Sequence, residues 1–100
     1  MTSTAPVIFI TGANTGLGLE IVKALCKSSK AYTIILGGRD LAKANAAAKE
    51  VQAEFTQSPS TVKTVQVDLE EDDSINRAFE HVSTEYGHLD VLVNNAGNAP

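Results

Sequence analysis

The chain has 100 residues, of which 43% are apolar and 20% charged, and its formal net charge is -4. This length allows one domain at most, and the composition is that of an ordinary soluble globular protein. Because the charge is weak and no block of like charges occurs, neither a nucleic-acid partner nor a membrane surface is indicated. The apolar runs are far shorter than the roughly 20 residues that span a bilayer.

The first six residues have neither the basic nor the apolar region of a signal peptide. We expect them to form a short disordered lead, followed by a single domain over 7–100. Cys26 is the only cysteine, so no disulfide can form within the chain. These features favour a cytoplasmic protein.

Four short apolar runs predict β-strands, and they lie at 7–11, 32–36, 62–67 and 91–93. The first, second and fourth are almost continuous in Val, Ile, Leu and Phe, which is typical of strands buried on both faces of a parallel sheet. The third alternates between apolar and polar residues, as a strand nearer an edge would.

The three segments between these runs have the period of amphipathic helices. The expected buried faces are Leu17, Ile21, Ala24, Leu25 and Ser28 in the first, Leu41, Ala44, Ala48, Val51 and Phe55 in the second, and Ile75, Ala78, Phe79 and Val82 in the third. Asp40 is placed to cap the second helix, Asp72 or Asp73 to cap the third, and Gly87 to end it.

Strands and helices that alternate in this way predict an α/β fold, a Rossmann-type doubly wound parallel sheet with the order β-α-β-α-β-α-β. A complete dinucleotide-binding fold has two halves and about six strands. This chain supplies one half and one further strand, so we expect a piece of a longer protein without its second half. The fourth strand would then be an exposed apolar edge.

A glycine-rich turn follows the first predicted strand and opens the first helix. In this turn Gly12 permits the tight exit, Gly16 allows close approach of a pyrophosphate, and Gly18 lets the helix pack against the sheet. The unpaired backbone N–H groups near Thr15 and Leu17 lie at the positive end of the helix dipole and suit a phosphate. The spacing and the missing lysine argue against an ATP-binding phosphate loop.

The end of the second strand indicates which dinucleotide is bound. An acidic residue there would hold the ribose 2′-hydroxyl of NAD, whereas an arginine suits the 2′-phosphate of NADP. Here Gly37 and Gly38 occupy the place of the acid, and Arg39 follows them. Asp40 could turn back to the ribose and favour NAD(H), but we interpret it as a helix cap and expect NADP(H).

Polar residues also follow the third and fourth strands, at the edge where ligands bind in open α/β sheets. Asp68 is placed to accept a hydrogen bond from an adenine amino group, although aspartate is also common in turns and caps. Asn94 and Asn95 precede Ala96 and Gly97 in a compact turn that can lie against a flat ligand. An ordinary exit from a strand would look similar.

Taken together, Thr11-Gly12-x-x-x-Gly16-x-Gly18, Asp68 and Asn94-Asn95-Ala96-Gly97 resemble the signature set of the short-chain dehydrogenases/reductases over nearly the whole chain. The resemblance implies structural roles for Thr11 and Asn94. It implies cofactor contacts at Gly12, Asn14, Thr15, Gly16, Leu17, Gly18, Arg39, Asp68, Leu69, Asn95, Ala96 and Gly97.

The Gly-Gly-Arg segment is similar to family members that prefer NADP, including carbonyl-reductase-like enzymes. The resemblance therefore implies an NADP(H)-dependent oxidoreductase that transfers hydride between nicotinamide and a carbonyl or alcohol substrate. It also implies a homodimer or homotetramer for the complete protein.

The family's catalytic serine and Tyr-x-x-x-Lys pair are absent from these 100 residues, since Leu36 and Asp90 stand four positions after Tyr32 and Tyr86. No catalytic residue is assigned, and the segment alone is expected to be inactive. No metal-ligand spacing occurs.

Two alternatives stay open. One is a non-catalytic dinucleotide-binding module or cofactor sensor, and the other is a methyltransferase on a similar sheet, which fits Arg39 and the Asn-Asn-Ala-Gly turn poorly.

Overall fold

The computed structural model describes residues 5–11, 16–67 and 72–94, and of residues 16, 17, 72–75 and 94 it describes only the backbone path. The elements in chain order are β1 (Val7–Thr11), α1 (Gly16–Lys27), β2 (Thr33–Gly38), α2 (Leu41–Glu54), β3 (Thr61–Gln66), α3 (Asp72–Tyr86) and β4 (Val91–Asn94). This is the predicted alternation of strands and helices.

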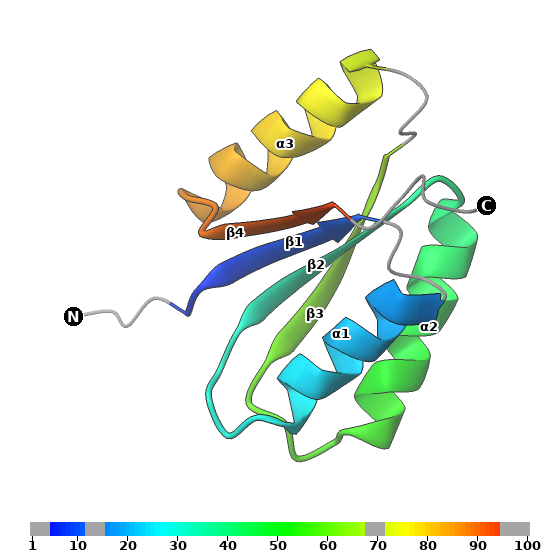
Figure 1. The fold of residues 1–100 in the computed structure, drawn as a ribbon, viewed down its shortest axis with the longest axis vertical. Coiled ribbons are helices and arrows are strands. Elements are labelled where there is room, and N and C mark those ends of the chain that lie inside the picture. The colour runs from blue at the N-terminus through cyan, green and yellow to red at the C-terminus, as the bar shows by residue number, and fades with distance from the viewer. Residues whose placement is uncertain (1–4, 12–15, 68–71, 95–100) are drawn as a thin grey trace.

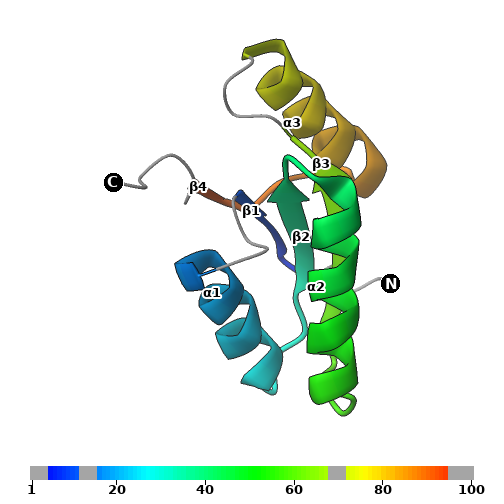
Figure 2. The same ribbon diagram turned by 90° about the vertical axis from the view of Figure 1, so that its right-hand side faces the viewer.

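The four strands form one parallel sheet with the order β3-β2-β1-β4. Figure 1 shows α3 on one side of this sheet and α1 and α2 on the other. Figure 2 shows α1 and α2 side by side in front of the sheet. The predicted doubly wound parallel architecture is therefore confirmed.

Each face of the sheet carries its own hydrophobic core. The larger core lies under α1 and α2 and contains Ile8, Ile10, Val22, Cys26, Ile34, Leu36, Ala48, Val51 and Val62. The smaller core lies under α3 and contains Val7, Phe9, Ile35, Val67, Ala78 and Val82. Successive residues of β1 enter opposite cores, because side chains alternate across a strand. This is why β1 needs an unbroken apolar sequence.

The outer strands differ from the central ones in burial. β3 forms one edge, and its exposed and buried residues alternate at Thr61, Val62 and Lys63, as the sequence pattern predicted. β4 forms the other edge of the described sheet, where Val91 is 45% and Leu92 51% exposed. β1 and β2, which have a neighbour on each side, supply most of the buried strand residues.

Two helix boundaries were predicted correctly. Asp40 precedes α2 and its Oδ1 accepts hydrogen bonds from the backbone N–H groups of Ala42 at 3.0 Å and Lys43 at 3.3 Å. Gly87 follows α3 with a φ of 79°, in the left-handed region that glycine adopts without strain. These residues determine where the helices begin and end relative to the sheet.

Three residues assigned to buried helix faces are exposed instead. One is Leu41, the first residue of α2, which is 39% exposed. Ala24 is exposed, and the buried row of α1 consists of Gly18, Val22 and Cys26, spaced four residues apart. Phe79 is 44% exposed on α3, next to the buried Ala78. A helical period defines an apolar face only to within about one residue on either side. Packing against the sheet then decides which of the neighbouring side chains is covered.

Within the described residues, no helix has the length and apolar character needed to cross a membrane.

Candidate cofactor site

The carboxyl ends of the four strands meet at one edge of the sheet. Thr11 is in register with Gly37 on one side and with Asn94 on the other, and Gly38 is in register with Gln66. In open α/β sheets ligands bind at this edge. Residues that are far apart in the sequence are therefore brought together where the sequence predicted the cofactor.

The first strand and helix frame the glycine turn. Gly12, Asn14 and Thr15 lie outside the described residues, while the predicted contacts Gly16, Leu17 and Gly18 form the first turn of α1. The N–H groups of a first helical turn have no partner within the helix, and the helix dipole is positive there. This end of α1 follows β1 closely and has the character of an anion-binding position.

Thr11 connects two strands at the same edge. Its side chain is 4% exposed, and its Oγ1 donates a hydrogen bond to the Val93 carbonyl oxygen at 3.4 Å. Thr11 and Asn94 are paired in the β1–β4 register. The structural roles expected for both residues stay predictions.

The two glycines at the end of β2 are both buried. At position 37, the packing of neighbouring side chains explains why the residue is a glycine. A Cβ atom at Gly37 would lie 2.7 Å from Cε1 of Phe9 and 3.0 Å from Cγ1 of Val67. Real Cβ atoms essentially never show a contact under 3.0 Å, such as the one to Phe9. The ring of Phe9 therefore occupies the space that a side chain at position 37 would need.

Arg39 is exposed and directly follows β2. Its carbonyl oxygen accepts a hydrogen bond from Nε2 of Gln66 at 3.1 Å, and the preceding carbonyl, of Gly38, accepts one from the Val67 N–H at 2.9 Å. The sequence analysis gave Gln66 no role. The alternation of apolar and polar residues in β3 could not show which residue the Gln66 side chain contacts.

Asp40 uses one carboxylate oxygen to cap α2, and its backbone carbonyl accepts a hydrogen bond from the Ala44 N–H at 3.0 Å. A carboxylate at a helix N-terminus is stabilised by the N–H groups and by the dipole. This geometry favours the interpretation of Asp40 as a cap over that of a ribose ligand.

The remaining predicted contacts, Asp68, Leu69, Asn95, Ala96 and Gly97, lie outside the described residues. Their described neighbours are Val67, which is buried, and Asn94, which ends β4.

Both histidines of the chain are paired with carboxylates. Nε2 of His81 on α3 lies 2.9 Å from Oε1 of Glu85, and both side chains are exposed. Nε2 of His88 lies 2.9 Å from Oδ2 of Asp90, and the same oxygen accepts a hydrogen bond from the Val7 N–H at 2.7 Å, at the amino end of β1. His88 is therefore at the opposite end of the sheet from the predicted cofactor residues.

Cys26 is buried in the larger core, and burial raises the pKa of its thiol, partly offset by a hydrogen bond to Ser58. The thiol is therefore protonated at neutral pH, which makes it a poor nucleophile. No cluster of three or more His, Cys, Asp or Glu residues suited to a metal ion occurs in the described part of the chain.

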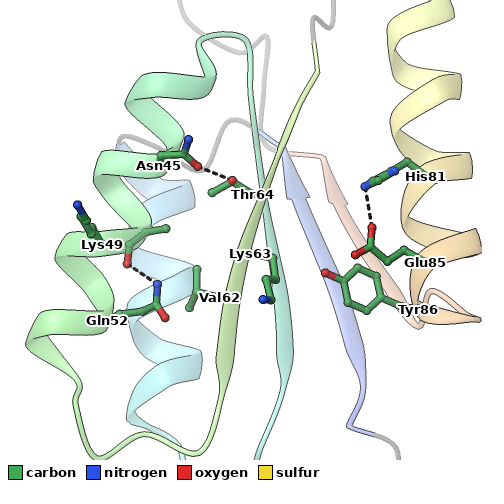
Figure 3. A pocket seen from close by; sticks show the side chains of 10 residues that line it. Asn45, Lys49, Gln52, Val62, Lys63, Thr64, His81, Glu85 and Tyr86 are labelled. Carbon is green, nitrogen blue, oxygen red and sulfur yellow. Dashed lines mark hydrogen bonds and ion pairs between the residues drawn. The ribbon is translucent and has the colours of Figure 1, made fainter.

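A polar hollow of about 330 Å³ lies along the β3 edge, away from the predicted cofactor residues. Figure 3 shows its lining from α2, β3 and α3, with Asn45 hydrogen-bonded to Thr64 and His81 paired with Glu85. Of its two exposed lysines, Lys63 stands on the edge strand, where a charge discourages pairing with another strand.

Comparison with known proteins identifies the family. The family model described as short chain dehydrogenase matches residues 6–100. The chain belongs to the short-chain dehydrogenase family. The resemblance inferred from the glycine turn and the strand ends is thereby confirmed.

Two curated relatives illustrate the similarity. The short-chain dehydrogenase/reductase eupG of Phoma sp. is 44% identical over 100 residues, covering 97% of this chain and 36% of its own length. Carbonyl reductase [NADPH] 1 of Sus scrofa is 42% identical over 99 residues, covering 99% of this chain and 32% of its own length. The chain thus spans about a third of the length of the curated relatives that it matches.

Solved structures confirm the fold. The menthone neomenthol reductase of Mentha piperita superimposes with a TM-score of 0.83 at 33% identity, over 95% of this chain and 32% of that chain. An oxidoreductase of Haemophilus influenza solved with bound NAD superimposes with a TM-score of 0.75 at 28% identity, over 97% of this chain and 33% of that chain. A metagenomic short-chain oxidoreductase solved in complex with NADP superimposes with a TM-score of 0.80 at 31% identity, over 94% of this chain and 39% of that chain. Neighbours of this fold have therefore been solved with NAD and with NADP.

Proposed function

We propose that this chain is the N-terminal, cofactor-binding part of an NADP(H)-dependent oxidoreductase that transfers hydride between the nicotinamide and a carbonyl or alcohol substrate. The observation that carries the choice of cofactor is the end of β2, where Asp40 caps α2 and Arg39 is exposed beside it. The similarity to a reductase named for NADPH supports the same choice.

The proposed site has two parts that recognise phosphate. The N–H groups at the start of α1 would bind the pyrophosphate, with the glycine turn before them. Arg39 would bind the 2′-phosphate through charge-assisted hydrogen bonds. We propose as cofactor contacts Gly12, Asn14, Thr15, Gly16, Leu17, Gly18, Arg39, Asp68, Leu69, Asn95, Ala96 and Gly97.

When bound, the cofactor supplies the hydride chemistry. The residues of this chain would hold and orient it. By resemblance to the family, the groups that act on the substrate carbonyl belong to a serine and a Tyr-x-x-x-Lys pair, and the sequence contains no such pair. We therefore propose that these 100 residues alone bind the cofactor without turning over substrate. A cytoplasmic homodimer or homotetramer is our proposal for the complete protein.

The first test is titration of the complete protein with NADPH and with NADH, followed by fluorescence. A charge-assisted contact is worth about 1.5–3 kcal/mol, so we expect NADPH to bind about 10- to 100-fold more tightly. Arg39→Asp should abolish that preference. Arg77→Asp makes the same change of charge on the exposed surface of α3 and should leave it unchanged.

Other outcomes would redirect the assignment. Equal or tighter binding of NADH by the unaltered protein would mean that Asp40 holds the ribose, and the choice of cofactor would be reversed. Binding of neither dinucleotide would favour a module that keeps the fold without the ligand. Binding without any carbonyl-dependent oxidation of NADPH would favour the cofactor sensor.

A further inference from the structure

The backbone of Arg39 lies between two peptide groups that are both hydrogen-bonded to the β3 segment. The carbonyl before Arg39, that of Gly38, accepts from the Val67 N–H at 2.9 Å. The carbonyl of Arg39 itself accepts from Nε2 of Gln66 at 3.1 Å. The two accepting carbonyls belong to consecutive residues, Gly38 and Arg39. The two hydrogen bonds therefore act on consecutive peptide planes, one on each side of the Arg39 Cα atom.

Two consecutive peptide planes determine the direction of the side chain between them. The planes set φ and ψ of the intervening residue, because the peptide units are themselves rigid. With φ and ψ fixed, the Cα–Cβ bond has one direction. The bonds from Val67 and Gln66 therefore determine where the Arg39 side chain leaves the backbone.

The segment after Arg39 is held separately by α2. The side chain of Asp40 caps the helix, and its carbonyl accepts the hydrogen bond from Ala44. Asp40 itself has extended backbone, with φ of -103° and ψ of 105°. Gln66 thus joins β3 to the one residue between the end of β2 and the helix cap.

We propose that Gln66 is a positioning residue for dinucleotide selectivity, acting through the backbone of Arg39. The inference rests on the proposed function, in which Arg39 binds the 2′-phosphate of NADP(H). Without the amide of Gln66, the peptide group after Arg39 loses its bond to β3 and can rotate. The guanidinium then spends less time where a phosphate can accept two parallel hydrogen bonds from it.

We expect a moderate effect on NADPH binding, because the hydrogen bond from the Gln66 side chain to the Arg39 carbonyl is exposed to solvent. In the complete protein, we expect Gln66→Met to raise the Kd of NADPH about threefold, the effect of losing one ordinary hydrogen bond. The Kd of NADH should stay unchanged, because NADH has no 2′-phosphate for Arg39 to bind. Methionine has a similar length and cannot donate a hydrogen bond.

The chain offers a matched control in Gln52. Its Nε2 also donates to a backbone carbonyl, that of Ala48, at 3.3 Å, but it lies on α2 beside the β3 edge (Figure 3). Gln52→Met should leave both dissociation constants unchanged. An equal effect of the two substitutions on NADPH would overturn the proposal, because it would show a general response to the loss of a surface glutamine.

A double-mutant cycle separates positioning from direct contact. In the Arg39→Ala background, Gln66→Met should cause no further rise in the Kd of NADPH. A further rise would overturn the proposal, since Gln66 would then act without Arg39. If Arg39→Ala itself leaves NADPH binding unchanged, the proposed function fails. If Arg39→Ala weakens NADPH binding and Gln66→Met does not, only the role of Gln66 fails.

Discussion

At the scale of single residues, the end of β2 shows that a small side chain can be required for packing as well as for binding. In the sequence, Gly37 and Gly38 occupy the place of the acidic residue that would hold the ribose of NAD. The structure adds that position 37 faces the smaller core, with Phe9 and Val67 in the space of a Cβ. Phe9 is 2% exposed and cannot move outward without unpacking that core.

Gly37→Ala should therefore destabilise the protein. Overpacking a tight core typically costs about 1–3 kcal/mol, and urea unfolding of the complete protein would measure the loss. The same substitution should cost less in a Phe9→Leu background, because the aromatic carbon that lies 2.7 Å away is then gone. An equal cost in both backgrounds would show that Phe9 is not the obstacle.

At the scale of elements, the start of α2 gives Asp40 a structural role. Arg39 would favour NADP(H) and the adjacent Asp40 could favour NAD(H), so the sequence alone was compatible with either dinucleotide. The two hydrogen bonds from the first turn of α2 to Asp40 make this carboxylate part of the helix. Because helix capping has its own energetic value, Asp40 needs no ligand to explain its presence.

Asp40→Ala should lower the free energy of unfolding by about 1 kcal/mol, the typical value of an N-cap. Asp40→Ser keeps a capping oxygen and should retain most of that stability, which chemical denaturation would show. The serine variant should also bind NADPH and NADH as the unaltered protein does. A selective loss of NADH binding in Asp40→Ser would mark the aspartate as a ribose ligand.

At the scale of the whole molecule, the two edges of the described sheet differ in character. The β3 edge presents polar residues and Lys63, which protect it from pairing with other strands. The β4 edge presents Val91 and Leu92, which are about half exposed on opposite faces of the strand. An apolar edge strand is a template for association.

We expect a polypeptide of these 100 residues to self-associate through β4 when it is produced alone. Leu92→Lys should raise the monomeric fraction in size-exclusion chromatography with light scattering. Phe79→Lys changes a residue of similar exposure on α3 and should have a much smaller effect. A sharp, reversible unfolding transition of a monomer of the unaltered polypeptide would contradict this prediction.

The sequence by itself was sufficient for the architecture. Continuous apolar runs predicted doubly covered strands, the alternating run predicted the β3 edge, and Asp40 and Gly87 predicted helix ends that the structure confirms. These features depend on residues close together in the chain. Local periodicity and backbone preference therefore carry the information.

Tertiary structure alone decided the contacts between distant residues. It placed Ala24, Leu41 and Phe79 at the surface, because the packing of a helix on the sheet selects among neighbouring side chains. It put Phe9 against Gly37, and it joined Gln66 to Arg39 across 27 positions of sequence. Such contacts depend on strand order and register, which bring side chains together in a way that no local pattern in the chain encodes.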